Sequence, residues 1–425
     1  MTTSMIIDNV RWLDAAGRLR DGPLWLASGR IRLAKPDGEL GAVLNGNSGL
    51  VLPGFVDTHT HLREPGQAQK EGIDNGSHAA CKGGVTTLLD MPNNVPPIVS
   101  SDRLAEKRAR FAAACRCNWG LFVQAPVADP ERLGPHAGVK LYMAQASALP
   151  ALSDLDAVAD VLGRHPRVVV HAEDETRFVP ATSTTLRPHH ERRPREAVLQ
   201  ALATVEQALA SIPEARRPRL ILAHAATLEE VRWLQRMKAA GFDVWGETCP
   251  HYLLLTEADY LREGARLQVN PPLRTPADRD ALLAALADGT LDFIGSDHAP
   301  HTPAEKAAAA GAPSGIPGIE WLAPALLHLV DRGLFDLARL NAITSANACR
   351  CYGIRERGAI ADGRIADLVL LTPEAAAGKP ITRAAYEPFA HLPLRWRTEA
   401  TLVNGALAYH HGRECPPTRG QEVVT

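Results

Sequence analysis

The chain has 425 residues, of which 45% are hydrophobic and 22% are charged, so it can form a large core and a smaller second domain. Its 46 Lys and Arg nearly balance its 48 Asp and Glu, which argues against nucleic acid or a membrane surface as a partner. No apolar run approaches the roughly 18 to 20 residues of a membrane span, and no basic segment precedes an apolar stretch at the N-terminus. We therefore expect a cytoplasmic globular protein that acts on a small molecule.

Both ends of the chain carry short β-type segments broken by Gly, Asp and Pro turns. We expect residues 1–52 and 355–425 to pair into one small β-sandwich. It would lie beside a main domain formed by residues 53–354.

In the main domain, short apolar runs alternate with amphipathic stretches, which is typical of parallel strands joined by helices. Ser101 begins one helix, Thr227 and Glu230 form a capping box at another, and Gly83 ends a third. Eight alternations favour an α/β fold of the (β/α)8 TIM barrel type. A doubly wound open sheet is the alternative, but it does not explain polar residues at the ends of so many strands. The eight runs are residues 50–57, 85–91, 119–125, 139–143, 168–171, 220–224, 242–248 and 291–297.

The ends of these runs carry candidate metal ligands. His59 and His61 lie two residues apart on a strand, so their side chains point to the same side. The ends of parallel strands meet at one rim of a barrel, where barrel enzymes assemble their sites. The further candidates at this rim are Lys140, His171, His224 and Asp297.

This set of residues points to hydrolytic chemistry. A lysine becomes an anionic ligand only after reaction with carbon dioxide, and a carboxylated Lys140 could then bridge two cations. Two divalent ions lower the pKa of a bridging water and polarise a carbonyl group. Asp297 could bind one ion and accept the proton of that water as the catalytic base. A His-rich shell of nitrogen and oxygen ligands suits zinc.

Five motifs and a C-terminal segment carry a resemblance to a known family. The motifs are His59-Thr-His61-Leu-Arg63-Glu-Pro-Gly66, Asp90-Met-Pro-Asn93-Asn, Asn270-Pro-Pro-Leu-Arg274, Ser296-Asp297-His-Ala-Pro-His301 and Gly315-Ile-Pro-Gly-Ile-Glu320. They resemble the signatures of dihydroorotases, which are cyclic amidohydrolases of the amidohydrolase superfamily. Residues 358–370 resemble the sandwich segment of the same enzymes, so the resemblance covers almost the whole chain.

The resemblance implies a zinc-dependent, reversible hydrolysis of L-dihydroorotate to N-carbamoyl-L-aspartate in pyrimidine biosynthesis. It implies two zinc ions, bridged by carboxylated Lys140 and a hydroxide. By matching motif, one ion would be held by His59, His61, Lys140 and Asp297, and the other by Lys140, His171 and His224. Arg63, Asn93 and His301 would bind the substrate carboxylate, and Asn270 would contact the ring. A planar arginine fork suits a carboxylate, which agrees with the role implied for Arg63.

Several alternatives stay open at this point. Allantoinases and hydantoinase-like dihydropyrimidinases share the chemistry but act on rings without an acidic substituent. Many bacterial dihydroorotases of similar length have an aspartate as the bridging ligand, whereas this chain has Lys140. An inactive scaffold for aspartate transcarbamoylase is a further possibility, although such chains usually lose metal ligands. The family resemblance also implies a homodimer.

Two further histidines, His251 and His298, lie close to the proposed rim. The implied ligands already fill two metal shells, so we expect these two side chains to support the ligands or the fold. His189 and His190 fall in a polar connection, where we expect solvated side chains.

Overall fold

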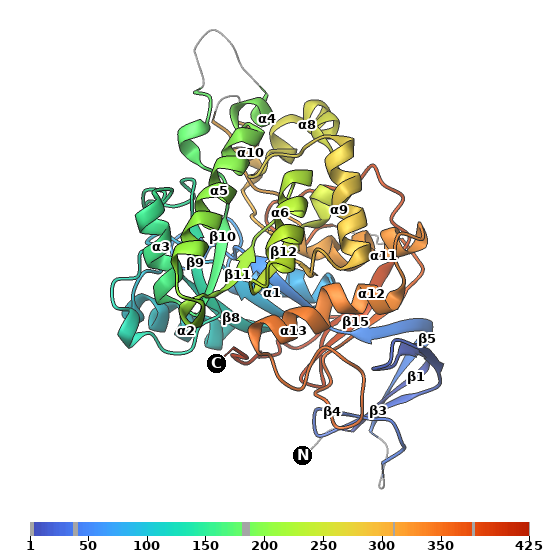
Figure 1. Cartoon of the computed structure of the whole chain (residues 1–425). Coiled ribbons are helices and arrows are strands. Elements are labelled where there is room, and N and C mark those ends of the chain that lie inside the picture. Colours follow the sequence, from blue (N-terminus) through green and yellow to red (C-terminus); the bar gives the residue numbers. More distant parts are fainter. Residues whose placement is uncertain (1–3, 37–40, 181–187, 309–310, 376–378, 425) are drawn as a thin grey trace.

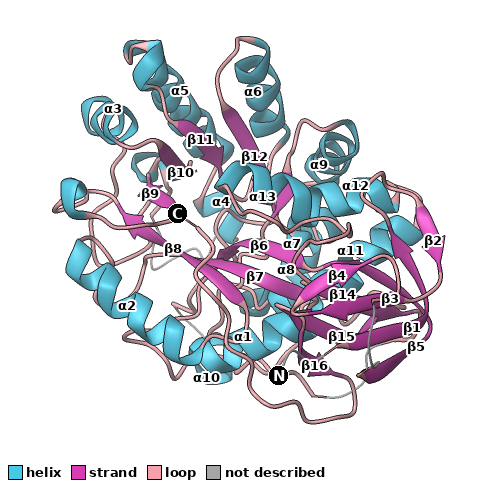
Figure 2. Ribbon diagram, turned by 90° about the horizontal axis from the view of Figure 1, so that it is seen from below, coloured by secondary structure: helices cyan, strands magenta, loops and turns pink. Residues whose placement is uncertain are grey.

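The computed structural model describes residues 4–36, 41–180, 188–308, 311–375 and 379–424. Its larger part is a barrel of eight parallel strands, which are neighbours in the same order as in the sequence (Figures 1 and 2). The TIM barrel prediction is therefore confirmed. The strands are β6 (Phe55–Thr60), β7 (Val85–Asp90), β8 (Asn118–Gln124), β9 (Gly138–Tyr142), β10 (Arg167–His171), β11 (Arg219–Leu222), β12 (Val244–Thr248) and β13 (Phe293–Ile294).

The barrel closes through the segment that follows its last strand. The His61 amide donates to the His298 carbonyl at 2.9 Å, and Thr60 and His298 form a parallel bridge. β13 has only two residues, so it is shorter than the predicted run 291–297. Asp297 has a φ of 45°, and this left-handed backbone cannot continue a strand ladder.

Helices surround the barrel (Figure 2), and their ends follow the predicted signals. Thr227 and Glu230 form the expected capping box of α6, and the Ser100 hydroxyl caps α2. The long connecting helices are α1 (Ile73–Lys82), α2 (Ser101–Ala114), α3 (Leu155–Arg164), α5 (Arg195–Ser211), α6 (Leu228–Ala239), α9 (Pro276–Asp288) and α11 (Leu322–Asp331). Shorter helices are α4 (His189–Arg192), α7 (Pro250–Leu254), α8 (Glu257–Glu263), α10 (Pro303–Lys306), α12 (Leu337–Asn341) and α13 (Asn347–Tyr352).

Both ends of the chain meet in a second sheet beside the barrel (Figure 1). Its strands are β1 (Met5–Leu13), β2 (Leu19–Asp21), β3 (Leu24–Ala27), β4 (Arg30–Arg32), β5 (Ala42–Pro53), β14 (Leu368–Thr372), β15 (Arg397–Val403) and β16 (Ala406–His410). β5 pairs parallel with β1 and antiparallel with β14, so it joins the two ends. The structure records these strands as one mixed sheet, and its division into the two layers of a sandwich stays a prediction.

The barrel interior changes character along the strands. Because side chains alternate on a strand, every second residue faces inward. On β10 these residues are Arg167 at the start, the buried Val169 in the middle and His171 at the end. Val169 packs in a buried apolar cluster with Phe122 and Ile221 of neighbouring strands. This apolar layer separates the two mouths of the barrel.

The chain shows no transmembrane helix in its described part, since none of the helices there is both long and apolar enough to cross a bilayer.

Candidate active site

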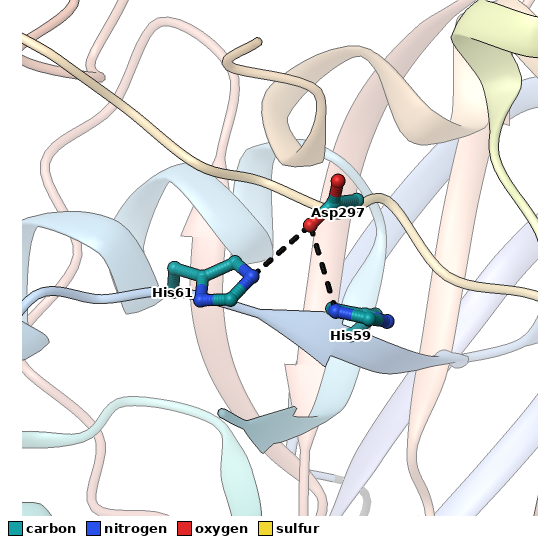
Figure 3. Close-up of side chains that lie close together, drawn as sticks. All are labelled: His59, His61 and Asp297. Atoms are coloured by element: carbon teal, nitrogen blue, oxygen red, sulfur yellow. Dashed lines mark hydrogen bonds and ion pairs between the residues drawn. The ribbon is translucent and has the colours of Figure 1, made fainter. Parts of the chain in front are cut away.

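His59, His61 and Asp297 converge at the C-terminal mouth of the barrel (Figure 3). The Oδ1 atom of Asp297 lies 3.1 Å from Nε2 of His61 and 3.6 Å from Nε2 of His59. All three side chains are buried, and their ligand atoms lie within 4.8 Å of one another. Two imidazole nitrogens and a carboxylate oxygen at this spacing are a donor set suited to a divalent metal ion.

His171 and His224 form a second group directly beside the first. Nδ1 of His171 lies 3.0 Å from Nε2 of His224. The ring of His224 lies 5.1 Å from the ring of His59, measured between centroids, which joins the two groups. The structure therefore brings these five predicted ligands into one continuous cluster, which we call the metal-type cluster.

Hydrogen bonds on the outer side of the cluster fix the imidazole tautomers. Nδ1 of His59 donates to Glu247 at 2.7 Å, and Nδ1 of His61 donates to Asn93 at 2.6 Å. Each ring then keeps an unprotonated Nε2 that faces Asp297. This arrangement prepares an imidazole for a metal, because a ligating nitrogen has to be free of its proton.

An outer hydrogen bond also fixes the tautomer of His171, but in this ring the outer nitrogen is Nε2. Its Nε2 donates to Glu173 at 3.0 Å, which leaves Nδ1 to face His224. Burial opposes ionisation of Glu173, but the charge of Arg193 and the bond from His171 hold its pKa well below the usual range. Glu173 therefore stays anionic and keeps the outer proton on His171.

Lys140 lies inside the barrel at the base of this cluster. Its side chain is completely buried, and Nζ has no hydrogen-bond partner among the residues that the structure describes. Burial lowers its pKa to about 8, against the opposing charges of Glu247 and Asp297. An amine of this kind is partly neutral near pH 8, and a neutral amine can react with carbon dioxide.

The backbone is strained at three of the predicted site residues. Arg63, His224 and Asp297 have φ values of 64°, 41° and 45°, in the left-handed region that non-glycine residues seldom adopt. Each residue lies two or three positions after the end of a barrel strand, so the strain turns its side chain over the mouth. Such strain persists only where the surrounding structure fixes it, and it concentrates at functional sites.

A cavity of about 490 Å³ opens above the cluster, and cations line one wall of it. Nη2 of Arg63 lies 3.2 Å from Nε2 of His301, and Nζ of Lys70 lies 3.2 Å from Nδ1 of the same ring. Burial, and then the charges of Arg63 and Lys70, lower the pKa of His301 to about 3, so the ring is neutral. This wall is suited to a small anionic group.

The remaining predicted substrate contacts also lie on this cavity. The Asn270 side-chain oxygen accepts a bond from Nε2 of His189 at 2.7 Å. Asn93 reaches the cavity too, but its side-chain oxygen contacts His61, so it touches a candidate ligand as well as the open space. The Tyr142 hydroxyl has no partner in the described part of the chain. Burial, with the charge of Asp297, holds its pKa well above normal, so it stays a proton donor.

The side chains of His298, His251 and His189 have different surroundings. His298 supports the barrel through its backbone carbonyl, and its ring lies 3.7 Å from Glu71. His251 is buried near the cluster, and within the described residues neither of its ring nitrogens has a partner. His189 is buried, so the expectation of a solvated side chain is wrong there: Nε2 of this ring contacts Asn270.

Sequence reasoning missed Glu247, Glu173 and Lys70. Glu247 is the last residue but one of the predicted run 242–248, so the rule that selected the other ligands could have found it. Glu173 follows His171 by two residues and repeats the spacing of the first histidine pair. No local signal marks Lys70, because its partner His301 lies 231 residues away in the sequence.

Comparisons with known proteins agree with this geometry. Residues 50–407 match the model of the amidohydrolase family. A dihydroorotase from Halobacterium salinarum is 38% identical over 375 residues, which cover 83% of this chain and 86% of that protein. A dihydroorotase from Bacillus caldolyticus is 33% identical, with 86% and 88% covered. An allantoinase from Rubrobacter xylanophilus is 32% identical, with 91% and 90% covered.

Solved structures share the fold. An L-hydantoinase (dihydropyrimidinase) from Arthrobacter aurescens superposes with a TM-score of 0.89 at 23% identity, and each chain is covered completely. A D-hydantoinase superposes with a TM-score of 0.85 at 25% identity, covering 99% of this chain and 98% of the other. These similarities support the barrel architecture.

Proposed function

This chain belongs to the amidohydrolase family, and from that premise we propose that it is a dihydroorotase. The reaction is the reversible hydrolysis of L-dihydroorotate to N-carbamoyl-L-aspartate, a step of pyrimidine biosynthesis. One observation carries the choice of substrate: Arg63 lies beside His301 and Lys70 on the wall of the cavity that holds the metal-type cluster. A carboxylate on the ring is the group that such a wall selects.

The donor set fits two metal ions. We assign His59, His61 and Asp297 to one ion, His171 and His224 to the other, and carboxylated Lys140 to both. Three features support this assignment: the unprotonated nitrogens that face Asp297, the two ring nitrogens 3.0 Å apart, and the orphaned amine of Lys140. Zinc suits this mixture of nitrogen and oxygen donors. Two such ions, when bound with a bridging hydroxide, supply a nucleophile at neutral pH and polarise the amide carbonyl.

Asp297 is the proposed proton carrier. Burial raises its pKa, but the interactions with the neighbouring His59 and His61 rings outweigh burial and hold the pKa well below the usual range. Its carboxylate is therefore ionised at neutral pH and can accept a proton from the attacking water. Hydrolysis delivers that proton to the leaving nitrogen, and ring closure runs the same transfer in reverse.

The polar wall holds the substrate in place for this transfer. Arg63 would clamp the substrate carboxylate with its planar fork, and His301 and Asn93 would add neutral donors. Asn270 lies across the cavity, where it would contact the ring, and the partner-free Tyr142 hydroxyl can donate to an oxygen of the substrate. These contacts fix one orientation of the ring above Asp297.

Two other functions follow from specific observations. The allantoinase and hydantoinase relatives share the fold, so an uncharged cyclic amide is the alternative substrate class. An inactive scaffold for aspartate transcarbamoylase is the alternative of another kind. The intact set of six candidate ligands argues against it.

The decisive experiment is a ring-opening assay on the zinc-loaded, bicarbonate-treated protein with L-dihydroorotate, allantoin and dihydrouracil. We expect turnover of dihydroorotate that chelation abolishes. Arg63→Gln should lower kcat/KM for dihydroorotate by about 10- to 100-fold, the value of one charge-assisted contact, and should leave any activity on dihydrouracil unchanged. Turnover of the uncharged rings alone would move the protein to the hydantoinase or allantoinase group. No turnover with metal bound would support the scaffold.

We also propose a cytoplasmic homodimer, with association to aspartate transcarbamoylase as a further possibility, and domain limits at residues 52/53 and 354/355. The family resemblance supports the dimer. The change of sheet between β5, which ends at Pro53, and β6, which begins at Phe55, is compatible with the first limit. Light scattering of the purified chain tests the dimer.

A further inference from the structure

A second cleft lies at the opposite, N-terminal mouth of the barrel, the end that Figure 2 shows from below. It has a volume of about 440 Å³. Its floor is formed where β9, β10, β11 and β12 begin, at Gly138, Arg167, Arg219 and Asp243. The apolar layer of the barrel lies between this cleft and the metal-type cluster.

The cleft carries an excess of positive charge. Arg167 and Arg219 are direct neighbours on adjacent strands, and Arg217 lines the same space. The lining includes one carboxylate, Asp243, which pairs with Nε of Arg219 at 2.9 Å and whose side chain is 49% exposed. Like charges side by side on a sheet are unfavourable unless an anion compensates them.

The guanidinium groups are held in place by contacts that leave part of each free. Nε of Arg217 donates to the carbonyls of Leu209 and Ile212, and its Cζ atom lies 4.6 Å from the centroid of the Phe242 ring. Neither Nη atom of Arg217 has a hydrogen bond to a described residue.

Arg167 and Arg219 follow the same pattern. Nη1 of Arg167 donates to the Ala137 carbonyl, and the group lies 5.3 Å from the Tyr352 ring. Its Nε is buried without a partner in the described part of the chain. Nη1 of Arg219 donates to the Cys351 carbonyl, and no bond to described residues uses its Nη2. Three anchored cations with unused donors form a preorganised anion site.

We propose that this cleft binds a small phosphate monoester. A phosphate group offers three oxygens to three guanidinium forks, which suits the cluster better than a single carboxylate does. The cleft is larger than a phosphate ion, so it has space for the esterified group, such as a sugar or nucleoside. This site is separate from the catalytic cavity, and the inference does not depend on the reaction catalysed there.

The test is calorimetric titration of the holoenzyme with inorganic phosphate and with ribose 5-phosphate, at constant ionic strength. Arg217→Gln should weaken binding by about tenfold or more, the effect of losing one charge-assisted contact. Arg216→Gln is the matched control, because Arg216 is exposed and contacts the Gly163 carbonyl outside the cleft. Arg63→Gln controls for binding at the catalytic cavity. Both control variants should keep the binding that Arg217→Gln loses.

Equal loss in Arg216→Gln would show nonspecific attraction, and loss in Arg63→Gln would place the anion in the catalytic cavity; either result overturns the proposal. Absence of binding by the unmodified protein overturns it too. If Arg217→Gln fails to fold, hydrogen exchange of the unmodified protein decides. Both ligands should then slow exchange at residues 134–138 and 217–219, and unchanged exchange there contradicts the site. Tighter binding of ribose 5-phosphate than of phosphate would identify the ester as the ligand.

Discussion

Two lysines are completely buried among the residues that the structure describes, and their surroundings differ in kind. Nζ of Lys107, on α2, lies 2.6 Å from Asp90, 2.8 Å from the Met91 carbonyl and 3.0 Å from Asn94. Nζ of Lys140, inside the barrel, has no hydrogen bond to any residue that the structure describes. Three acceptors for three N–H groups complete the first site. The Lys140 amine has no such acceptors among the described residues.

This difference distinguishes a lysine that stabilises the fold from a lysine with a proposed role in the active site. Burying an amine without partners costs free energy, so a fold retains such a group only where something else compensates the cost. Lys107 supports the fold: its partner Asp90 also accepts a bond from the Leu62 amide, just after His61. We propose that the Lys140 amine is carboxylated and that the resulting carbamate binds metal ions. Four predictions test this contrast.

The largest effect is expected for Lys140→Met. Loss of the proposed bridging ligand should lower kcat on dihydroorotate by at least about 10³-fold, since the charge stabilisation supplied by both ions is weakened. The free energy of unfolding of the metal-free protein should not fall, because an unpaired buried amine is removed. Activity assays and urea unfolding measure the two effects. Retained activity with full metal content would contradict the role of Lys140.

The opposite behaviour is expected for Lys107→Met. Removing one partner of a buried ion pair leaves the Asp90 carboxylate uncompensated, which should cost about 3 to 5 kcal/mol of unfolding free energy. The double variant Lys107→Met/Asp90→Asn should recover much of this loss, because the unpaired charge is gone. A single variant as stable as the unmodified protein would remove the distinction between the two lysines.

Lys70 should have an intermediate effect. Nζ of Lys70 can only donate, so Nδ1 of His301 accepts and Nε2 carries the N–H, which the Ser314 carbonyl at 3.1 Å can share with a substrate carboxylate. Lys70→Met removes the cation that fixes this tautomer and should lower kcat/KM on dihydroorotate by about tenfold, mainly through KM. Lys70→Arg should restore part of it. An equal loss on dihydrouracil would show a general structural defect in place of a role in carboxylate binding.

The last prediction concerns the pH dependence of the free energy of unfolding. Burial lowers the pKa of His251 to about 4, below the ordinary value of 6.5. Between pH 6.5 and pH 4 the unfolded chain therefore binds a proton at His251 that the folded chain does not bind. The free energy of unfolding has its full value above pH 6.5 and decreases as the pH falls towards 4.

His251→Gln should remove about 2 kcal/mol of the drop in unfolding free energy between pH 7.5 and pH 5. Urea unfolding at both pH values measures the difference. His391→Gln, at an exposed position, is the matched control and should leave the drop unchanged. Identical pH dependence in the His251 variant and the unmodified protein would mean that His251 is hydrated.

Much of the fold could be predicted from the sequence, since its signals are local. The alternation of apolar runs and helix caps located the barrel strands, and the Thr227 capping box formed as expected. Strand ends were less predictable. β13 has only two residues, and the left-handed backbone of Asp297 follows three residues after its end. The adjacent Ser296 amide donates to Asp57, on a strand more than 200 residues away in the sequence, and such a contact leaves no local signal.

The type of chemistry could be predicted from the residue types alone. Residue types at strand ends and the two-residue period of a strand placed His59, His61, Lys140, His171, His224 and Asp297 at one rim, as closure of a parallel barrel requires. Which nitrogen of each histidine is free, and which buried amine is unpaired, became known from the folded structure. Those properties depend on contacts such as that of His59 with Glu247, 188 residues away, which exist only after the barrel has closed.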